Sequence, residues 1–211
     1  MKPILFSTDM VRAILDDRKT ETRRVVKPQP PKNTDYLEPE DVEGNGWLCI
    51  SNFDGGEFKD GDHWRKCPYG QVGGRLWVRE TWMPETENGI KTGGIIYRAT
   101  DKPEKDGENP LRWRPSIHMP KSASRITLEI TDIQIERVQD ITEEGARAEG
   151  VSAIPYYLPS EIPEKNFAYR LGLGAITRPR FARLWDSINE KRGYGWNSNP
   201  FVWVIKFRRI T

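Results

Sequence analysis

The stretch from Arg125 to Val138 constrains the fold more than any other part of this sequence. Its apolar residues alternate with polar ones, and they are Ile126, Leu128, Ile130, Ile133 and Ile135. A period of two is the pattern of a strand with one buried face. The phase changes around Asp132, which predicts a β-bulge at that point. The sequence therefore predicts one long strand at the centre of a sheet.

Three more segments have the composition of strands. Residues 76–80 and 95–98 combine β-branched, aromatic and charged side chains, and the last segment covers residues 200–208. Valine, isoleucine and aromatic residues are the types that fit a pleated, half-buried surface. We therefore expect strands at all three positions.

Short helices are expected between these strands. Ser7 or Thr8 can cap the first, in which Met10, Val11, Ile14 and Leu15 follow helical spacing. A basic segment, residues 18–24, leaves this helix and ends before a long stretch rich in Pro, Asn, Asp and Gly, residues 27–70. Such composition is typical of loops with at most short strands.

Two further helices have recognisable ends. Asp140 or Thr142 can cap the second, residues 143–149, and Gly150 stands where a left-handed C-terminal cap is usual. The third covers residues 180–191 and has apolar side chains on one face. Together, the elements predict an α+β fold: a compact mixed or antiparallel, barrel-like sheet with short helices and long polar loops.

The charge balance limits the partners of the chain. Its 33 Lys and Arg residues nearly equal its 31 Asp and Glu residues, so a polybasic nucleic-acid binder is excluded. Basic residues gather at 18–27 and 75–125, whereas acidic ones gather at 35–62 and 136–149. Any nucleic-acid site is therefore expected to be local.

Other classes of protein are excluded by what the sequence lacks. No apolar run approaches the ~18 to 20 residues of a membrane helix, so we expect no membrane contact and a cytoplasmic protein. Cys49 and Cys67 form no CxxC pair, and His63 and His118 are the only histidines. Zinc deaminases, Ser-His and Cys-His hydrolases are therefore disfavoured. No metal or cofactor is expected, because no phosphate-binding glycine motif occurs either.

One group of residues could carry chemistry. Lys19 lies among Arg18, Arg23 and Arg24, and neighbouring cations or burial can lower the pKa of a lysine enough to make it a base. If the turn is helical, Thr22 shares a face with it, and a carboxylate such as Glu149 could orient the amine. The alternative is that this basic run complements a helix dipole and that Glu149 only ends a helix.

Three stretches share motifs with a known family. Residues 14–24 read Ile-Leu-Asp-Asp-Arg-Lys-Thr-Glu-Thr-Arg-Arg, residues 74–80 read Gly-Arg-Leu-Trp-Val-Arg-Glu, and residues 140–150 read Asp-Ile-Thr-Glu-Glu-Gly-Ala-Arg-Ala-Glu-Gly. This pattern resembles the ASCH-domain family of the PUA-like superfamily. Members have a helix leading into G-[RK]-K-T-x-T-x-R, a G-D-x-L-x-V strand, and a short helix beginning I/L-T-E. The style of the sequence is also similar to phage and prophage proteins of this family.

The resemblance implies a fold and an activity. The fold is a PUA-like mixed or antiparallel β-barrel, a single domain over residues 1–211 with insertions at about 28–70, 83–121 and 152–178. One bacterial ASCH group hydrolyses N4-acetylcytidine to cytidine and acetate with a Lys, a Thr and a Glu. By motif position these fall on Lys19, Thr22 and Glu149, and Arg24 matches the family's arginine. If the protein is phage-encoded, it is expected in the cytoplasm of a bacterial host.

Two positions depart from the family pattern. Asp17 replaces the glycine before R-K-T, and Asp can adopt the left-handed conformation at modest cost, so the turn is expected to survive. Gly74 is followed by Arg75 where the family often has Gly-Asp, so the start of that strand is expected to differ.

A binding function without catalysis is the alternative. The superfamily more often binds RNA or modified bases, and some ASCH proteins have been assigned ribonuclease activity. The partner would then be a nucleoside, a modified base or single-stranded RNA, with Trp77, Trp82 or Trp113 as stacking faces. Core packing is the competing interpretation for Trp77. The basic residues expected to contact phosphates are Arg18, Arg23, Arg24, Arg75, Arg79, Arg112 and Arg114.

Overall fold

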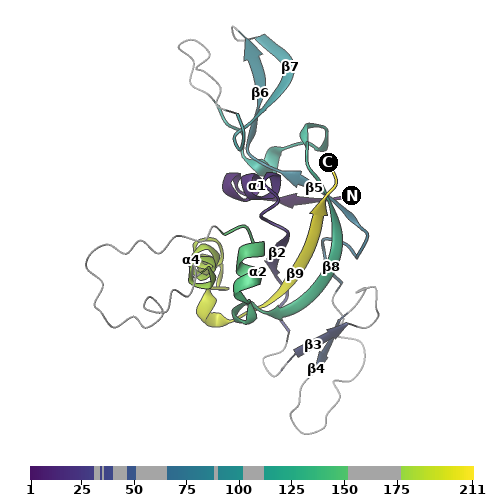
Figure 1. Ribbon diagram of the computed structural model, residues 1–211, viewed down its shortest axis with the longest axis vertical. Coiled ribbons are helices and arrows are strands. Elements are labelled where there is room, and N and C mark those ends of the chain that lie inside the picture. The colour runs from purple at the N-terminus through teal and green to yellow at the C-terminus, as the bar shows by residue number, and fades with distance from the viewer. Residues whose placement is uncertain are drawn as a thin grey trace, which may run out of the picture.

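A mixed five-stranded sheet forms the centre of the protein (Figure 1). The computed structural model describes residues 1–30, 34, 36–39, 47–50, 66–87, 90–101, 112–151 and 177–211. The strand order in the sheet is β1 (Lys2–Leu5), β5 (Arg75–Arg79), β8 (Thr127–Arg137), β9 (Phe201–Arg209) and β2 (Glu21–Val25). The β1–β5 pair is parallel, and the other three pairs are antiparallel. The α+β class is therefore confirmed.

The long central strand has the expected bulge. Its pairing with β9 shifts register between Ile130 and Asp132, where the alternation of apolar residues changes phase. Both β8 and β9 curve strongly across the molecule in Figure 1. Because a bulge increases local twist and bends its strand, it accounts for part of this curvature.

Two hairpins extend from the main sheet. One consists of β3 (Tyr36–Pro39) and β4 (Trp47–Ile50), and the other of β6 (Trp82–Glu87) and β7 (Ile90–Tyr97). The second hairpin protrudes at the top of Figure 1.

A buried ion pair joins the second hairpin to the sheet. Arg125 donates to both carboxylate oxygens of Glu80, each at 3.0 Å, and its guanidinium lies 3.9 Å from the ring centroid of Tyr97 in β7. Glu80 is 1% exposed, so this carboxylate is compensated inside the protein rather than by water.

The helices have the local signals expected of them. Helix α1 (Thr8–Leu15) is capped by Ser7, whose hydroxyl accepts from the Met10 N–H. Helix α2 (Glu143–Ala148) is capped by Thr142 rather than by Asp140, and it ends at the left-handed Gly150. Five short 3₁₀ segments complete the described elements: Ser116–His118, Lys121–Ala123, Val138–Asp140, Glu190–Arg192 and Trp196–Ser198.

The third helix begins before its expected start. Helix α4 (Arg178–Asn189) starts two residues earlier than the apolar pattern indicates, with Pro179 in its first turn, where a missing N–H costs nothing. The chain then continues through the 3₁₀ segment Glu190–Arg192 to Gly193, which has a φ of 81°.

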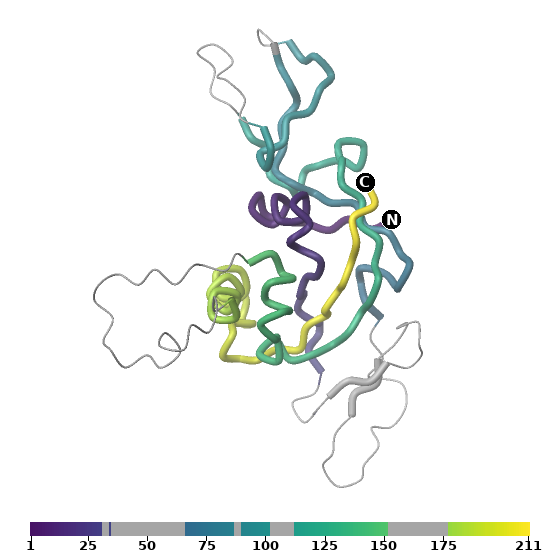
Figure 2. Tube along the Cα trace, viewed as in Figure 1, coloured from purple at the N-terminus to yellow at the C-terminus, as the bar shows by residue number. Residues whose placement is uncertain are grey.

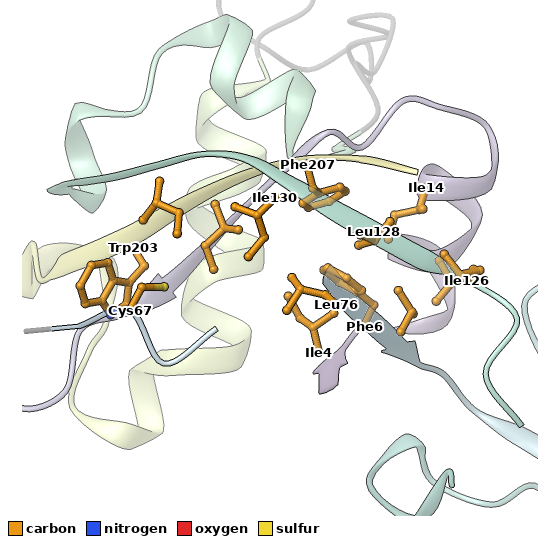
Figure 3. Packing of buried hydrophobic residues seen from close by; sticks show 14 of the residues in the cluster. Ile4, Phe6, Ile14, Cys67, Leu76, Ile126, Leu128, Ile130, Trp203 and Phe207 are labelled. Carbon is orange, nitrogen blue, oxygen red and sulfur yellow. The ribbon is translucent and has the colours of Figure 1, made fainter. Parts of the chain in front are cut away.

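Strand β9 contributes to both cores of the protein. The larger cluster packs around Ile4, Phe6, Ile14, Leu76 and the strand residues labelled in Figure 3. The smaller one packs helices α2 and α4 against the opposite face of β9, and it consists of Val138, Ile141, Ala146, Phe181, Trp185, Val202 and Val204. Burial on both faces explains why the last strand is a nearly continuous run of apolar residues.

The segment after α1 differs from its sequence-based interpretation. A turn with Asp17 at φ 54° leads directly into the edge strand β2, so most of the basic segment expected at residues 18–24 belongs to a strand. Figure 2 shows this path from α1 into β2 in purple. The left-handed Asp17 confirms that aspartate supports the turn in place of glycine.

The described strands do not close into a barrel. Strands β1 and β2 form the two edges of the sheet, and neither pairs with the other. One side chain crosses the opening: Arg24 of β2 donates through Nη2 to the Leu5 carbonyl of β1 at 2.7 Å. Within the described ranges, no helix is long and apolar enough to span a membrane.

Candidate active site

A fully buried ion pair joins the end of α2 to the turn after α1. Lys19 Nζ lies 2.5 Å from Glu149 Oε2, and the two side chains are 0% and 3% exposed. The backbones also meet, because Lys19 and Glu149 form a β-bridge and the Thr20 N–H donates to the Ala148 carbonyl at 2.8 Å. The two helix ends therefore hold both side chains in place.

Glycine is required for this close approach. A Cβ atom on Gly150 would lie 2.7 Å from the Ala13 Cβ and 2.9 Å from the Lys19 Cβ, and the residue has a φ of 79°. Both the space and the backbone conformation exclude a side chain. The glycine that ends α2 thus also lets the helix reach Lys19.

All three donors of Lys19 are used. The ammonium donates to Glu149 Oε2, to the Glu149 carbonyl at 2.8 Å and to the Glu21 carbonyl at 2.8 Å. Burial lowers the pKa of Lys19, and Glu149 offsets this only in part. The ring of Phe6, 5.5 Å from Nζ, covers the amine on another side.

The second oxygen of Glu149 binds Arg23. Glu149 Oε1 accepts from the Arg23 backbone N–H at 2.5 Å and lies 3.5 Å from Nη1. The same guanidinium donates to Glu21 at 2.6 Å and to Glu136 at 2.7 Å. Burial would lower the pKa of Arg23, but the three carboxylates together raise it. Burial also raises the pKa of Glu136, with Arg23 opposing.

A cavity of about 410 Å³ lies beside this network. Glu149 and Thr22 both line it, whereas the described lining does not include Lys19. The rest of the described wall comes from α1, from β2 and the residues after it, from the segment before β5, and from α4 with the 3₁₀ segment that follows it. It consists of Met10, Arg23, Arg24, Val25, Lys27, Pro68, Tyr69, Phe181, Leu184, Trp185, Ile188, Asn189 and Arg192. A volume in this range is typical of small-molecule sites.

Thr22 is positioned differently from its sequence-based interpretation. It lies in strand β2, so it does not share a helical face with Lys19, and that expectation is wrong. Its side chain is 2% exposed, and none of the described residues hydrogen-bonds to its hydroxyl. The hydroxyl at the cavity wall is therefore available to a ligand.

Arg24 also lines the cavity. Besides its bond to the Leu5 carbonyl, its guanidinium lies 5.3 Å from the ring centroid of Phe6. Its Nε is buried, and in the described part of the chain it has no hydrogen-bond partner.

The other candidate residues lie away from the cavity. Arg18 is exposed and pairs with Asp16 at 2.9 Å. Arg79 donates to the carbonyls of Met119 and Ile117 and lies 5.3 Å from the ring of the half-buried Trp77. Arg75 and Arg112 are exposed.

Two arginine–tryptophan contacts occur near the β6–β7 hairpin. Arg114 lies 5.2 Å from the ring centroid of Trp82, and Arg98 lies 5.9 Å from that of the half-buried Trp113. Trp82 is only 7% exposed, so its ring packs in the protein. The basic residues expected to act together are thus dispersed: Arg23 and Arg24 line the cavity, Arg114 lies near this hairpin, and the others lie elsewhere.

Several residues of the site were not predicted from the sequence. Glu21 and Glu136, the carboxylate partners of Arg23, were not predicted, nor was the wall formed by Tyr69 and α4. Charges at every second residue, Lys19, Glu21 and Arg23, are a strand pattern that could have indicated β2. No comparable signal marks Glu136. His63 lies outside the described residues, and no described group of three or more His, Cys, Asp or Glu could hold a metal ion.

Comparisons with known proteins do not identify this chain. No family model, no curated protein and no solved structure matches it.

Proposed function

We propose that this protein is an ASCH-type hydrolase that binds a cytosine nucleoside in the cavity and cleaves an acyl amide from its exocyclic nitrogen. Its open sheet would be a PUA-like barrel variant in which Arg24 bridges the gap between β1 and β2. One observation carries the proposal: the carboxylate of a fully buried Lys–Glu pair lines the same cavity as Thr22.

Burial of this pair favours a functional role over a purely structural one. Removing two charges from water costs several kcal/mol, and apolar residues of similar size often stabilise a fold better. Ionisable groups with perturbed pKa values cluster at functional sites, because catalytic groups need pKa values matched to their task. Burial lowers the pKa of Lys19, and Glu149 connects this lysine to a cavity of ligand size.

The geometry supports specific roles for three residues. Glu149 is the group of the pair that reaches the cavity, so it acts as the general base, while Lys19 holds and orients it. Thr22 donates its free hydroxyl to the acyl carbonyl oxygen and stabilises the negative charge that develops there. Lys19 is thus a positioning residue.

The reaction balances with water as the nucleophile. Glu149 takes one proton from a water molecule, and the resulting hydroxide attacks the acyl carbon to form a tetrahedral intermediate. The carbon–nitrogen bond then breaks, and the departing nitrogen takes the proton from Glu149 and becomes an amino group. The acyl group leaves as a carboxylic acid, which ionises in solution. This sequence returns Glu149 to its starting state.

The cavity wall suits a planar base. Tyr69 and Trp185 supply aromatic surface, and Met10, Leu184 and Ile188 supply apolar surface. Aromatic and apolar side chains are the usual surface against which small ligands pack.

Acetate release from N4-acetylcytidine tests the proposal. We expect turnover by the wild type and losses of about 100-fold or more in kcat for Glu149→Gln, the size expected for loss of a general base. Lys19→Met removes the residue that orients Glu149. Its matched control is Lys206→Met, because Lys206 pairs with Asp132 at 3.0 Å on the surface. No turnover by the folded wild type, or equal turnover by Glu149→Gln, would overturn the proposal.

The arginine–tryptophan contacts favour a second candidate, binding of single-stranded RNA at the hairpin. Arg98 and Arg114 are exposed beside Trp113 and Trp82. Oligonucleotide binding there should quench tryptophan fluorescence and weaken steeply with salt. Arg98→Gln and Arg114→Gln should reduce binding, and unchanged affinity in both variants would contradict this second function.

A further inference from the structure

The cavity carries an excess of positive charge. Arg24, Lys27 and Arg192 line it, and none of them has a carboxylate partner among the described residues. Glu149 is the only acidic residue in the described lining, and its charge is already matched by Lys19 and Arg23.

These three cations differ from the buried ones in their accessibility. Lys19 and Arg23 are buried and use their donors on carboxylates and carbonyls. Lys27 and Arg192 are exposed, so their charged groups reach both solvent and the cavity. Lys27 Nζ lies 5.0 Å from the ring centroid of Tyr194, a contact that leaves its N–H donors available.

Arg24 provides a further donor at the cavity wall. Its contacts with Leu5 and Phe6 hold the guanidinium in place, yet the only hydrogen bond that it makes to the described residues uses Nη2. A guanidinium has five N–H donors arranged in a fork that matches the oxygens of a phosphate. The immobilised guanidinium therefore has donors to spare at the cavity wall.

We infer that the ligand of this cavity carries a phosphate monoester, so that the substrate class is a cytosine nucleotide rather than a nucleoside. This inference rests on the proposed function for the base, which is placed at Thr22 and Glu149. The phosphate binds Arg24, Lys27 and Arg192. Hydrogen bonds between charged groups are shorter and about twice as strong as neutral ones. A dianion thus matches three cations that have no carboxylate partner in the described part of the chain.

Helix α4 supplies a control for this idea. Cations near a helix C-terminus also complement its dipole, which would explain Arg192 without a ligand. Arg183 and Lys191 belong to the same helical segment and are exposed, but the described cavity lining does not include them. The double variants Lys27→Gln/Arg192→Gln and Arg183→Gln/Lys191→Gln remove the same charge from inside and outside the cavity.

Calorimetric titration with cytidine 5′-monophosphate, cytidine and ribose 5-phosphate tests the inference. We expect the wild type to bind the nucleotide on the order of tenfold or more tightly than cytidine, because one charge-assisted contact corresponds to about that factor. Lys27→Gln/Arg192→Gln should lose this preference, and Arg183→Gln/Lys191→Gln should keep it. Ribose 5-phosphate should compete with the nucleotide.

Other outcomes separate this inference from the proposed function. Equal affinity for nucleotide and nucleoside, or equal losses in both double variants, would overturn the phosphate site. Tighter binding of an oligocytidine without a terminal phosphate would overturn the assignment to a monoester. If the nucleotide preference holds while no acylated cytosine compound is hydrolysed, the phosphate site stands and the hydrolase proposal fails.

Discussion

Glu149 accepts a 2.5 Å hydrogen bond from Lys19, although 130 residues separate the two in the chain. Each of the two residues ends a local structure: Lys19 follows the turn after α1, and Glu149 is the C-cap of α2. Their contact places a buried charge pair at the wall of a cavity that also includes Thr22.

The Lys19–Glu149 pair should show strong coupling in a double-mutant cycle. Lys19→Met removes the closer of the two cations that compensate the buried Glu149 carboxylate and leaves it only the more distant guanidinium of Arg23, so it should reduce the free energy of unfolding by about 3–5 kcal/mol. Glu149→Gln likewise leaves the buried ammonium of Lys19 without its carboxylate partner. In the double variant Lys19→Met/Glu149→Gln both side chains are uncharged, and the glutamine keeps an acceptor for the Arg23 N–H. The expected coupling is about 2–3 kcal/mol, measured by urea denaturation. Losses that add within about 0.5 kcal/mol would contradict it.

The stability of the protein should depend on the protonation of Lys19. Burial lowers the pKa of Lys19 below its ordinary value of 10.5, so the unfolded chain binds this proton more tightly than the folded one. The free energy of unfolding should therefore rise with pH between the folded pKa and 10.5. The free energy of unfolding, measured between pH 7 and 10.5, should rise less with pH in Lys19→Met than in the wild type. Lys206→Met should keep the wild-type slope, and identical slopes in all three proteins would refute the prediction.

Thr22→Val should separate function from stability. The described structure gives the hydroxyl no hydrogen-bond partner, and valine suits strand β2, so the free energy of unfolding should change by about 0.5 kcal/mol or less. If the hydroxyl stabilises the developing negative charge, kcat should fall by about 100-fold to 1,000-fold. Thr22→Ser should retain most of the activity. Full activity in Thr22→Val would remove this residue from the mechanism.

Gly150→Ala should be more harmful than the same change at Gly193. Both glycines have positive φ, 79° and 81°, so alanine costs about 1–2 kcal/mol at either position. Only at Gly150 would the new Cβ overlap neighbours, Ala13 and Lys19. Crowding should add about 1–3 kcal/mol, seen as a lower urea midpoint, and should displace Lys19 and reduce turnover. Equal destabilisation by the two changes would contradict this prediction, because it would show that the end of α2 moves to make room for the new Cβ.

Much of the local structure could be predicted from the sequence. The caps at Ser7 and Thr142, the bulged alternation of β8 and the left-handed Gly150 all depend on residues within a few positions of one another. Periodicity, capping and turn chemistry act over that range, so they leave a readable pattern. Strand β2 was missed because charged residues, rather than apolar ones, occupy its buried positions, as at Glu21 and Arg23.

The sequence by itself determined the α+β class, most element positions and, through motif resemblance, the candidate residues Lys19, Thr22 and Glu149. Only the tertiary structure decided that Lys19 is buried and paired with Glu149. It also decided that Arg23 binds Glu21 and Glu136 and that α4 forms a wall of the cavity. The physical reason is that the Lys19–Glu149 and Arg23–Glu136 contacts join residues 130 and 113 positions apart in the chain through packing and charge compensation. Such contacts depend on shape and burial, which no local spacing in the chain records.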